Sequence, residues 1–138
     1  MNTFTRSVEL LHRAMDVNSL RYQVSANNIA NSEVSNYKRQ TVNFESELKR
    51  AFESEADKSH RFELTRTDSR HFALEEPYDW KSVEPRRVTD WTTTAAANGN
   101  NVDAEYEATV VLKTQMNYRL LAQLQNFEFS QVKLAMRK

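Results

Sequence analysis

The sequence predicts a mainly α-helical protein in which long N- and C-terminal helices pack as an antiparallel, coiled-coil-like pair around a small central β or loop insert. Two stretches of helical apolar periodicity occupy the two ends of the 138-residue chain, and neither contains glycine or proline. Beyond about Glu55 and before the second stretch, the helical period is lost, and both prolines lie in this region. We therefore expect one helical domain with an insert, in three parts. Residues 1–57 form the N-terminal helix, an asparagine-rich turn and a short helix, residues 58–98 form the insert, and residues 99–138 form the C-terminal helix.

Composition argues against several classes of partner. Lys plus Arg and Asp plus Glu both number 19, so no net charge favours nucleic acid or an anionic membrane. The chain has one glycine and no cysteine, which leaves no glycine-rich phosphate loop and no disulfide. No stretch approaches the ~20 apolar residues that a membrane span requires. The first residues lack the basic start and apolar run of a secretory signal, so we expect export, if it occurs, to use another route.

The N-terminal helix is predicted from about Thr5 to about Ala30. A stripe with alternating spacings of four and three supports it: Phe4, Val8, Leu11, Met15, Asn18, Tyr22, Ser25 and Ile29. Asn18 and Ser25 are polar residues on this stripe. Two interpretations stay open: they fix the register between packed helices, or they face solvent at a frayed seam.

The C-terminal helix is expected to begin after Gly99, with Asn101 as its N-cap ahead of Val102. It carries two apolar stripes on roughly opposite sides. The first contains Leu112, Met116, Leu120, Leu124, Phe127 and Leu134, and the second contains Val110, Val111, Tyr118, Leu121, Phe129, Val132 and Met136. The N-terminal helix can cover one stripe only, so the other is predicted to contact other subunits. The predicted assembly interface comprises Val8, Leu11, Met15, Tyr22, Ile29, Leu112, Met116, Tyr118, Leu120, Leu124, Phe127, Phe129, Val132 and Leu134.

The middle of the chain reads as a short helix capped by Asn43 and then as short strands. The strands are expected at residues 61–67 and 88–93, where β-branched and aromatic residues are frequent. Trp80 and Trp91 lie near arginines, but without a net positive charge we interpret them as anchors of the insert rather than as base-stacking residues.

No catalytic or metal-binding constellation is recognisable. His12, His60 and His71 lack the helical i, i+4 spacing and the neighbouring carboxylates of a zinc site. A single glycine cannot supply a Gly-x-Ser-x-Gly nucleophile turn. We therefore expect no enzyme activity, no cofactor and no small-molecule substrate.

Three asparagines within five residues, Asn27, Asn28 and Asn31, are poor choices for a helix interior but suit a helix end. The run Ala26, Asn27, Asn28, Ile29, Ala30 and Asn31, followed by Tyr37, resembles the N-terminal signature shared by the bacterial flagellar rod and hook proteins. The segment Asn100, Asn101, Val102 and Asp103 before the last helix is similar to that family as well. The family usually has Thr-Pro-Gly-Tyr where this chain has Val34-Ser35-Asn36-Tyr37, so Asn36 takes the place of a glycine. Asparagine tolerates a positive φ better than most residues.

The resemblance implies a structural subunit of the flagellar basal-body (proximal) rod, part of the drive shaft that transmits torque for motility. It implies export through the flagellar type III apparatus without a cleaved signal and a place in the periplasmic rod. The implied partners are copies of the chain itself, other flagellar rod proteins, the inner-membrane ring or ring–rod junction protein, and the export apparatus. An alternative from another class is a soluble coiled-coil adapter or flagellar export chaperone that binds one partner helix.

Overall fold

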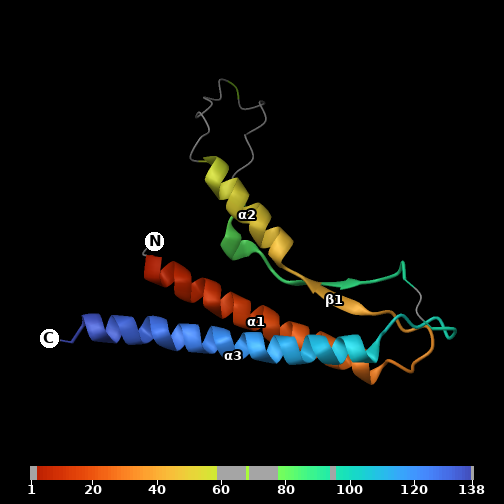
Figure 1. The fold of residues 1–138 in the computed structure, drawn as a ribbon. Helices are drawn as coiled ribbons and strands as arrows, with labels where there is room; N and C mark the ends of the chain where they lie inside the picture. The colour runs from red at the N-terminus through yellow and green to blue at the C-terminus, as the bar shows by residue number, and fades with distance from the viewer. Residues whose placement is uncertain (1–2, 59–67, 69–77, 94–95, 138) are drawn as a thin grey trace. The chain divides into compact units, whose positions relative to one another are not determined.

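The computed structural model describes residues 3–58, 68, 78–93 and 96–137 (Figure 1). The elements in chain order are α1 (Thr3–Ala30), β1 (Gln40–Asn43), α2 (Glu45–Lys58), the 3₁₀ turn η1 (Trp80–Ser82), β2 (Arg86–Thr89) and α3 (Ala104–Ala135). The chain divides into two compact units, of which the first combines Met1–Val42 with Arg87–Lys138 and the second is Asn43–Arg86. The predicted class is confirmed: long terminal helices pack together, and the sheet has two strands.

In the first unit, α1 and α3 lie side by side and run in opposite directions (Figure 1). Their buried residues all lie in the halves nearest the connection between the helices: Val17, Asn18, Val24, Ser25 and Asn28 on α1, and Glu107 and Thr114 on α3. Tyr22, which the heptad spacing places at the seam, is 42% exposed. The face of α1 that meets α3 is therefore rotated slightly from the predicted stripe.

The buried residues of the helix pair include polar side chains as well as valines. Asn18 and Ser25 are both buried, which decides between the two interpretations in favour of the seam and against solvent. The Asn18 Nδ2 donates to the Ala14 carbonyl at 2.7 Å, and the Thr114 Oγ1 donates to the Val110 carbonyl at 2.7 Å. Each side chain thus satisfies its polar group within its own helix, which avoids the cost of a buried, unpaired donor.

The N-cap of α3 is Asp103, so the expectation that Asn101 caps this helix is wrong. The Asp103 carboxylate accepts hydrogen bonds from the backbone N–H groups of Glu105, at 3.0 Å, and Tyr106, at 3.1 Å. The physical reason is that the Asn101 side chain is already bonded to other parts of the chain, as described below. Glu105 and Glu107 in the first turn and Lys133 in the last turn suit the helix dipole.

The small sheet joins β1 to β2. The Asp90 N–H donates to the Arg39 carbonyl at 2.9 Å, and the Thr41 hydroxyl donates to the Val88 carbonyl at 3.4 Å, as expected for antiparallel strands. β2 overlaps the strand predicted at 88–93, but it begins at Arg86 and ends at Thr89. β1 is not among the predicted strands, and the strand predicted at 61–67 lies outside the described residues.

The second unit is built on α2 and η1. The short helix predicted after Asn43 is confirmed, with Glu45 and Glu47 in its first turn. Trp80 is buried, and its ring lies 6.0 Å from that of Phe52. The anchoring role predicted for the two tryptophans is therefore confirmed for Trp80. It is wrong for Trp91, whose side chain lies outside this unit and is 74% exposed.

Candidate assembly surfaces: the asparagine clasp and the outer face of α3

Asparagine residues, three of them with buried side chains, join the end of α1, the turn after it and the segment before α3. We call this group the asparagine clasp and define it as Asn28, Asn31, Asn36, Asn98, Asn100 and Asn101. Asn28 and Asn100 are 0% and 1% exposed, so their amides are bonded to protein groups rather than to solvent.

Asn100 holds the turn that follows α1. Its Nδ2 lies 2.9 Å from each of three backbone carbonyls, those of Asn31, Ser32 and Val34. Its Oδ1 accepts the Val102 N–H at 2.7 Å. The three carbonyls lie just beyond Ala30, the last residue of α1, so this one side chain fixes the path of the chain as it leaves the helix, from 66 or more residues away.

Asn28 attaches α1 to β1. Its Nδ2 donates to the Gln40 carbonyl at 2.7 Å, and its Oδ1 accepts the Gln40 N–H at 3.1 Å and the Tyr37 hydroxyl at 3.2 Å. The side chain therefore pairs with both backbone groups of Gln40, much as a neighbouring strand does. Burial raises the pKa of Tyr37, and the Glu107 charge raises it further.

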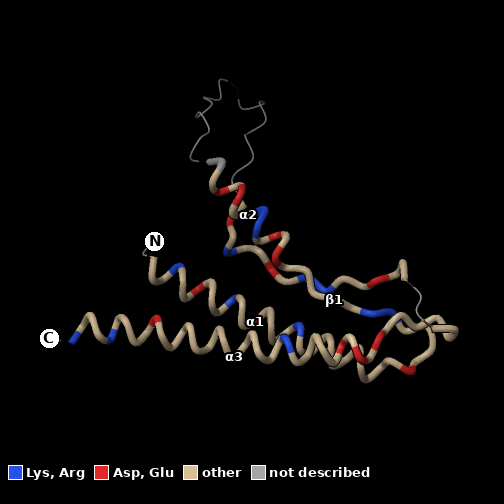
Figure 2. The backbone as a smooth tube through the Cα atoms, in the orientation of Figure 1, with Lys and Arg blue, Asp and Glu red and all other residues tan. Residues whose placement is uncertain are grey.

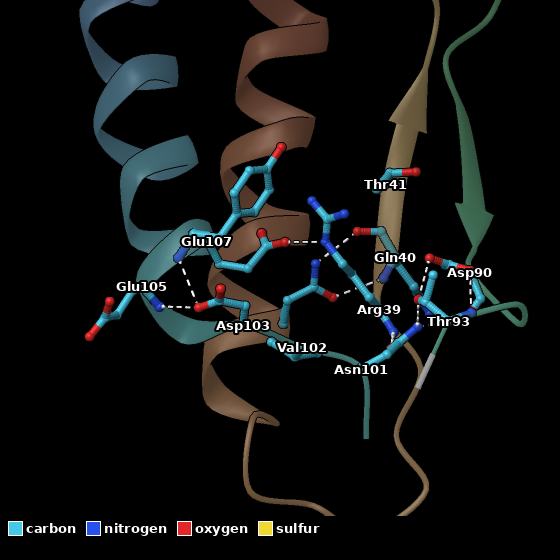
Figure 3. Close-up of polar contacts among 12 residues, drawn as sticks. Arg39, Gln40, Thr41, Asp90, Thr93, Asn101, Val102, Asp103, Glu105 and Glu107 are labelled. Carbon is cyan, nitrogen blue, oxygen red and sulfur yellow. Dashed lines mark hydrogen bonds and ion pairs between the residues drawn. The ribbon is translucent and has the colours of Figure 1, made fainter. Parts of the chain in front are cut away.

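Asn101 ties together three segments around the sheet (Figure 3). Its Oδ1 accepts the Arg39 N–H at 2.6 Å, while its Nδ2 lies 2.9 Å from both the Asp90 carbonyl and the Thr93 hydroxyl. The Asp90 carboxylate in turn accepts the Thr93 hydroxyl, the Thr92 N–H and the Thr92 hydroxyl, and these bonds hold the pKa of Asp90 well below its usual range.

A buried ion pair lies beside the clasp. The Arg39 Nε donates to the Glu107 Oε1 at 2.5 Å, and Glu107 is only 1% exposed (Figure 3). The Arg39 guanidinium also lies 4.7 Å from the centre of the Tyr106 ring. Burial alone lowers the pKa of Arg39, but the hydrogen bond and charge of Glu107 outweigh it, so the net shift is upward. The pair fixes the start of α3 against the segment that leads into β1.

Two left-handed residues bring the loops of the clasp into contact. Asn36 has φ 59° and Gly99 has φ 80°. The prediction that Asn36 occupies a position suited to glycine is thus confirmed. A Cβ on Gly99 would lie 2.6 Å from the Asn36 Oδ1, and the Lys38 Nζ donates to the Gly99 carbonyl at 2.8 Å. The backbone angle of Gly99 therefore favours glycine, and any larger residue would also have to displace the Asn36 side chain.

The clasp accounts for much of the predicted family signature. Asn28, Asn31, Tyr37, Asn100 and Asn101 all meet within it. Ala26, Ile29 and Val102 are half-buried near these bonds, while Asn27 and Ala30 are exposed. Asp103 serves as the cap of α3.

The second candidate surface is the outer face of α3, which we define as the first predicted stripe: Leu112, Met116, Leu120, Leu124, Phe127 and Leu134. All six side chains are between 44% and 62% exposed. No charged residue lies between Arg119 and Glu128, in the middle of this helix (Figure 2).

The second stripe of α3 is partly covered by α1. Val110, Val111, Leu121 and Val132 are half-buried, and the Phe129 ring packs edge-on at 5.9 Å from that of Phe4. Tyr118 and Phe129 still expose nearly half of their surface, and on α1 the predicted Val8, Leu11, Met15 and Ile29 are half-buried. The helix pair therefore uses one stripe and leaves the other open.

Several important residues did not stand out in the sequence. Nothing in the sequence distinguishes Glu107 from the other acids near the start of α3, and its half-buried partner Arg39 lies 68 residues away. Asn100 and Asn101 were singled out, but their long-range bonds carry no local sequence signal.

A pocket of about 130 Å³ lies beside the ion pair and is lined by residues that include Arg21, Ser25, Arg39, Tyr106 and Glu107. It is smaller than the ~300–1,000 Å³ typical of ligand pockets. Within the described parts of the chain, no group of three or more His, Cys, Asp or Glu residues is arranged to hold a metal ion. Of the described helices, none combines the length and the apolar character needed to cross a membrane.

Comparison with known proteins gives a consistent result. No protein-family model matches the chain. The flagellar basal body rod protein FlgB of Borreliella burgdorferi is 38% identical over 137 residues, which cover 99% of this chain and 100% of that protein. The FlgB of Borrelia hermsii is 36% identical over the same shares of both chains. The FlgB of Bacillus subtilis is 31% identical over 96% of this chain and 95% of its own length. With this similarity along its whole length, the chain belongs to the FlgB family of flagellar basal body rod proteins and is a structural component of the bacterial flagellum.

Proposed function

We propose that the chain is a non-enzymatic subunit of the proximal rod whose outer face of α3 packs against helices of neighbouring subunits. The observation that carries the proposal is the continuous bare stripe from Leu112 to Leu134, opposite the side that α1 covers. Along a helix this stripe extends over roughly 33 Å at about 1.5 Å per residue. Soluble monomers seldom leave apolar strips of this length uncovered.

The energetic argument favours burial of this face in an assembly. Burying a large aliphatic or aromatic side chain yields about 1.5–3 kcal/mol relative to leaving it exposed. The six residues of the outer face are already partly shielded, so a neighbouring helix gains only part of that amount from each. Even so, the sum is enough to offset much of the entropy lost on association.

The clasp gives the proposed subunit its rigidity. It fixes the angle and register between α1 and α3 through buried amides and the Arg39–Glu107 pair, so a force on one helix passes directly to the other. In this proposal torque is transmitted passively through packing. A surface that meets a different surface on the next subunit generates a ring or helical assembly without a catalytic step.

The proposed partners are copies of this chain and other rod proteins, with the inner-membrane ring or ring–rod junction protein and the flagellar export apparatus as further contacts. The proposed location is the periplasmic part of the basal body. The support for both is the name of the relatives, which are rod proteins of the basal body. The same names do not favour the alternative of a soluble adapter or export chaperone.

A charge placed on the outer face tests the proposal. Leu120 is 55% exposed, so Leu120→Asp is expected to leave the fold intact but to put a carboxylate in the subunit interface. In a strain that lacks the chromosomal copy, the variant should accumulate normally, fail to restore swimming in soft agar and be missing from purified basal bodies.

The matched control is Asn117→Asp, which adds the same charge to an exposed polar position on α3. It should restore swimming. Phe129 is less suitable for this test because it packs on Phe4 within the chain. Normal swimming by the Leu120→Asp strain, at normal protein level, would disprove the role of the outer face.

A further inference from the structure

The single glycine of the chain follows an asparagine, Asn98. Asn-Gly sequences are chemically labile because glycine has no side chain to shield its backbone nitrogen from the preceding amide. The Gly99 nitrogen, once deprotonated by hydroxide, attacks the Asn98 Cγ. The N–Cγ bond forms, the Cγ–Nδ2 bond breaks, and ammonia leaves. Water then opens the resulting succinimide at either carbonyl and gives aspartate or isoaspartate.

In the closed clasp, hydrogen bonds hold the reacting groups of the Asn98–Gly99 dipeptide. The Gly99 N–H, which carries the proton of the attacking nitrogen, donates to the Ala96 carbonyl at 3.0 Å. The Asn98 Oδ1 accepts the Asn100 N–H at 3.0 Å, which restrains the side-chain amide. The Asn98 carbonyl accepts the Asn36 N–H at 3.0 Å.

Burial does not provide this protection, because the Asn98 side chain is exposed and solvent reaches it. The hydrogen bonds alone restrain the dipeptide. Reaction therefore requires the clasp to open, and its rate in the native protein is the rate in the open chain multiplied by the fraction of time spent open.

Isoaspartate would be incompatible with the closed clasp. It routes the backbone through the former side chain and so lengthens the main chain by one carbon before Gly99. The segment has little slack for this change, since the Asn98 carbonyl, the Gly99 N–H and the Gly99 carbonyl are bonded to Asn36, Ala96 and Lys38. The shifted chain would also withdraw the Asn100 amide from the carbonyls that it bonds in the turn after α1.

We propose that Asn98 is a spontaneous deamidation site that the closed clasp shields, and that its conversion to isoaspartate keeps the clasp open. Isoaspartate at position 98 therefore accumulates in chains that have spent time unfolded. The proposal does not depend on the assignment to the rod.

The test incubates the full chain at mildly alkaline pH, with and without urea, and follows modification at Asn98 by peptide mass spectrometry. Isoaspartate is quantified by enzymatic methylation. In urea, Asn98 should react faster than any other asparagine, and without urea its rate should fall by at least about tenfold. Equal rates with and without urea would overturn the shielding, and a slow reaction at Asn98 in urea would overturn the site itself.

Two variants separate local opening from general unfolding. Lys38→Met removes only the bond to the Gly99 carbonyl and should raise the native rate at Asn98 while far-UV circular dichroism stays unchanged. Asn117→Ala, on the exposed surface of α3, should leave the rate at its native value. A Lys38→Met rate equal to that of the unaltered chain would count against control by the clasp.

Amide hydrogen exchange tests whether isoaspartate keeps the clasp open. The isoaspartate form, isolated by chromatography, should show faster amide exchange at residues 31–36 than the unmodified chain. Equal exchange would refute the proposed opening.

Discussion

At the scale of single residues, this chain uses asparagine side chains to join its segments, where most folds use backbone pairing or hydrophobic contact. The Asn28 amide pairs with both backbone groups of Gln40, and the Asn100 amide reaches three carbonyls in the turn after α1. An amide has both donors and an acceptor, so it satisfies freed backbone groups of either kind. That property explains why asparagine, a poor helix former, is concentrated here.

The first residue-scale prediction concerns Asn100→Ala. The change leaves up to three carbonyls without their donor, so we expect a loss of about 2–4 kcal/mol in the free energy of unfolding. Urea titration followed by circular dichroism measures it. Asn27→Ala, an exposed member of the same sequence signature, should change stability by less than about 0.5 kcal/mol. If both substitutions have the same effect, the role assigned to Asn100 in holding the turn after α1 is wrong.

The second residue-scale prediction concerns pH. Bonds from Thr93 and Thr92 hold the pKa of Asp90 below its usual value of 3.8, so the folded state favours the carboxylate. The resulting stabilisation is fully present above that usual value and is lost as pH falls below it. Melting temperatures measured from pH ~6 to pH ~2.5 should therefore fall less steeply for Asp90→Asn than for the unaltered chain. Identical pH profiles would show that these bonds do not contribute.

At the scale of elements, the helices were predictable and the connections between them were not. The apolar period located α1, α2 and α3, because burial on one side of a helix leaves a direct mark on the sequence. β1 leaves no such mark, since Gln40–Asn43 is short and largely polar and is held by Asn28 and Asn101 from outside the sheet. The cap of α3 was misplaced by two residues because Asn101 and Asp103 are both good N-caps, and only the long-range bonds of Asn101 distinguish them.

An element-scale prediction compares the two tryptophans. Trp80 is buried against Phe52, so Trp80→Ala should destabilise the second unit by about 3–5 kcal/mol. Trp91 is largely exposed, and Trp91→Ala should change stability by less than about 0.5 kcal/mol. Far-UV circular dichroism of each variant during urea unfolding measures the two changes. A large loss of stability from Trp91→Ala would contradict the exposed position described for it.

At the scale of the whole molecule, stability is distributed unevenly along the helix pair. The buried residues of α1 begin at Val17, and those of α3 end at Thr114. Both helices continue well beyond these points with apolar side chains that have no complete cover within the chain, such as Leu124 and Phe127. The half of the helix pair next to the clasp is therefore expected to be stably folded in the isolated chain. The stability of the far half is expected to depend on contacts with neighbouring subunits.

Hydrogen exchange on the isolated chain tests this expectation. Amides in residues 17–30 and 104–114 should exchange more slowly than those in residues 3–16 and 115–135, because local opening costs least where fewest residues are buried. In purified basal bodies the difference should largely disappear. Uniform protection along both helices of the isolated chain would contradict the expectation.

The antiparallel path of α1 and α3 has a practical consequence. Thr3 and Ala135 lie at the same end of the pair, and Phe4 touches Phe129 there, so both ends of the described chain leave the molecule together. A fluorescent protein or affinity tag joined to either of these ends would extend from the same end of the helix pair. Labelling for microscopy should accordingly use a small dye on an engineered cysteine, which would be the only thiol in the chain.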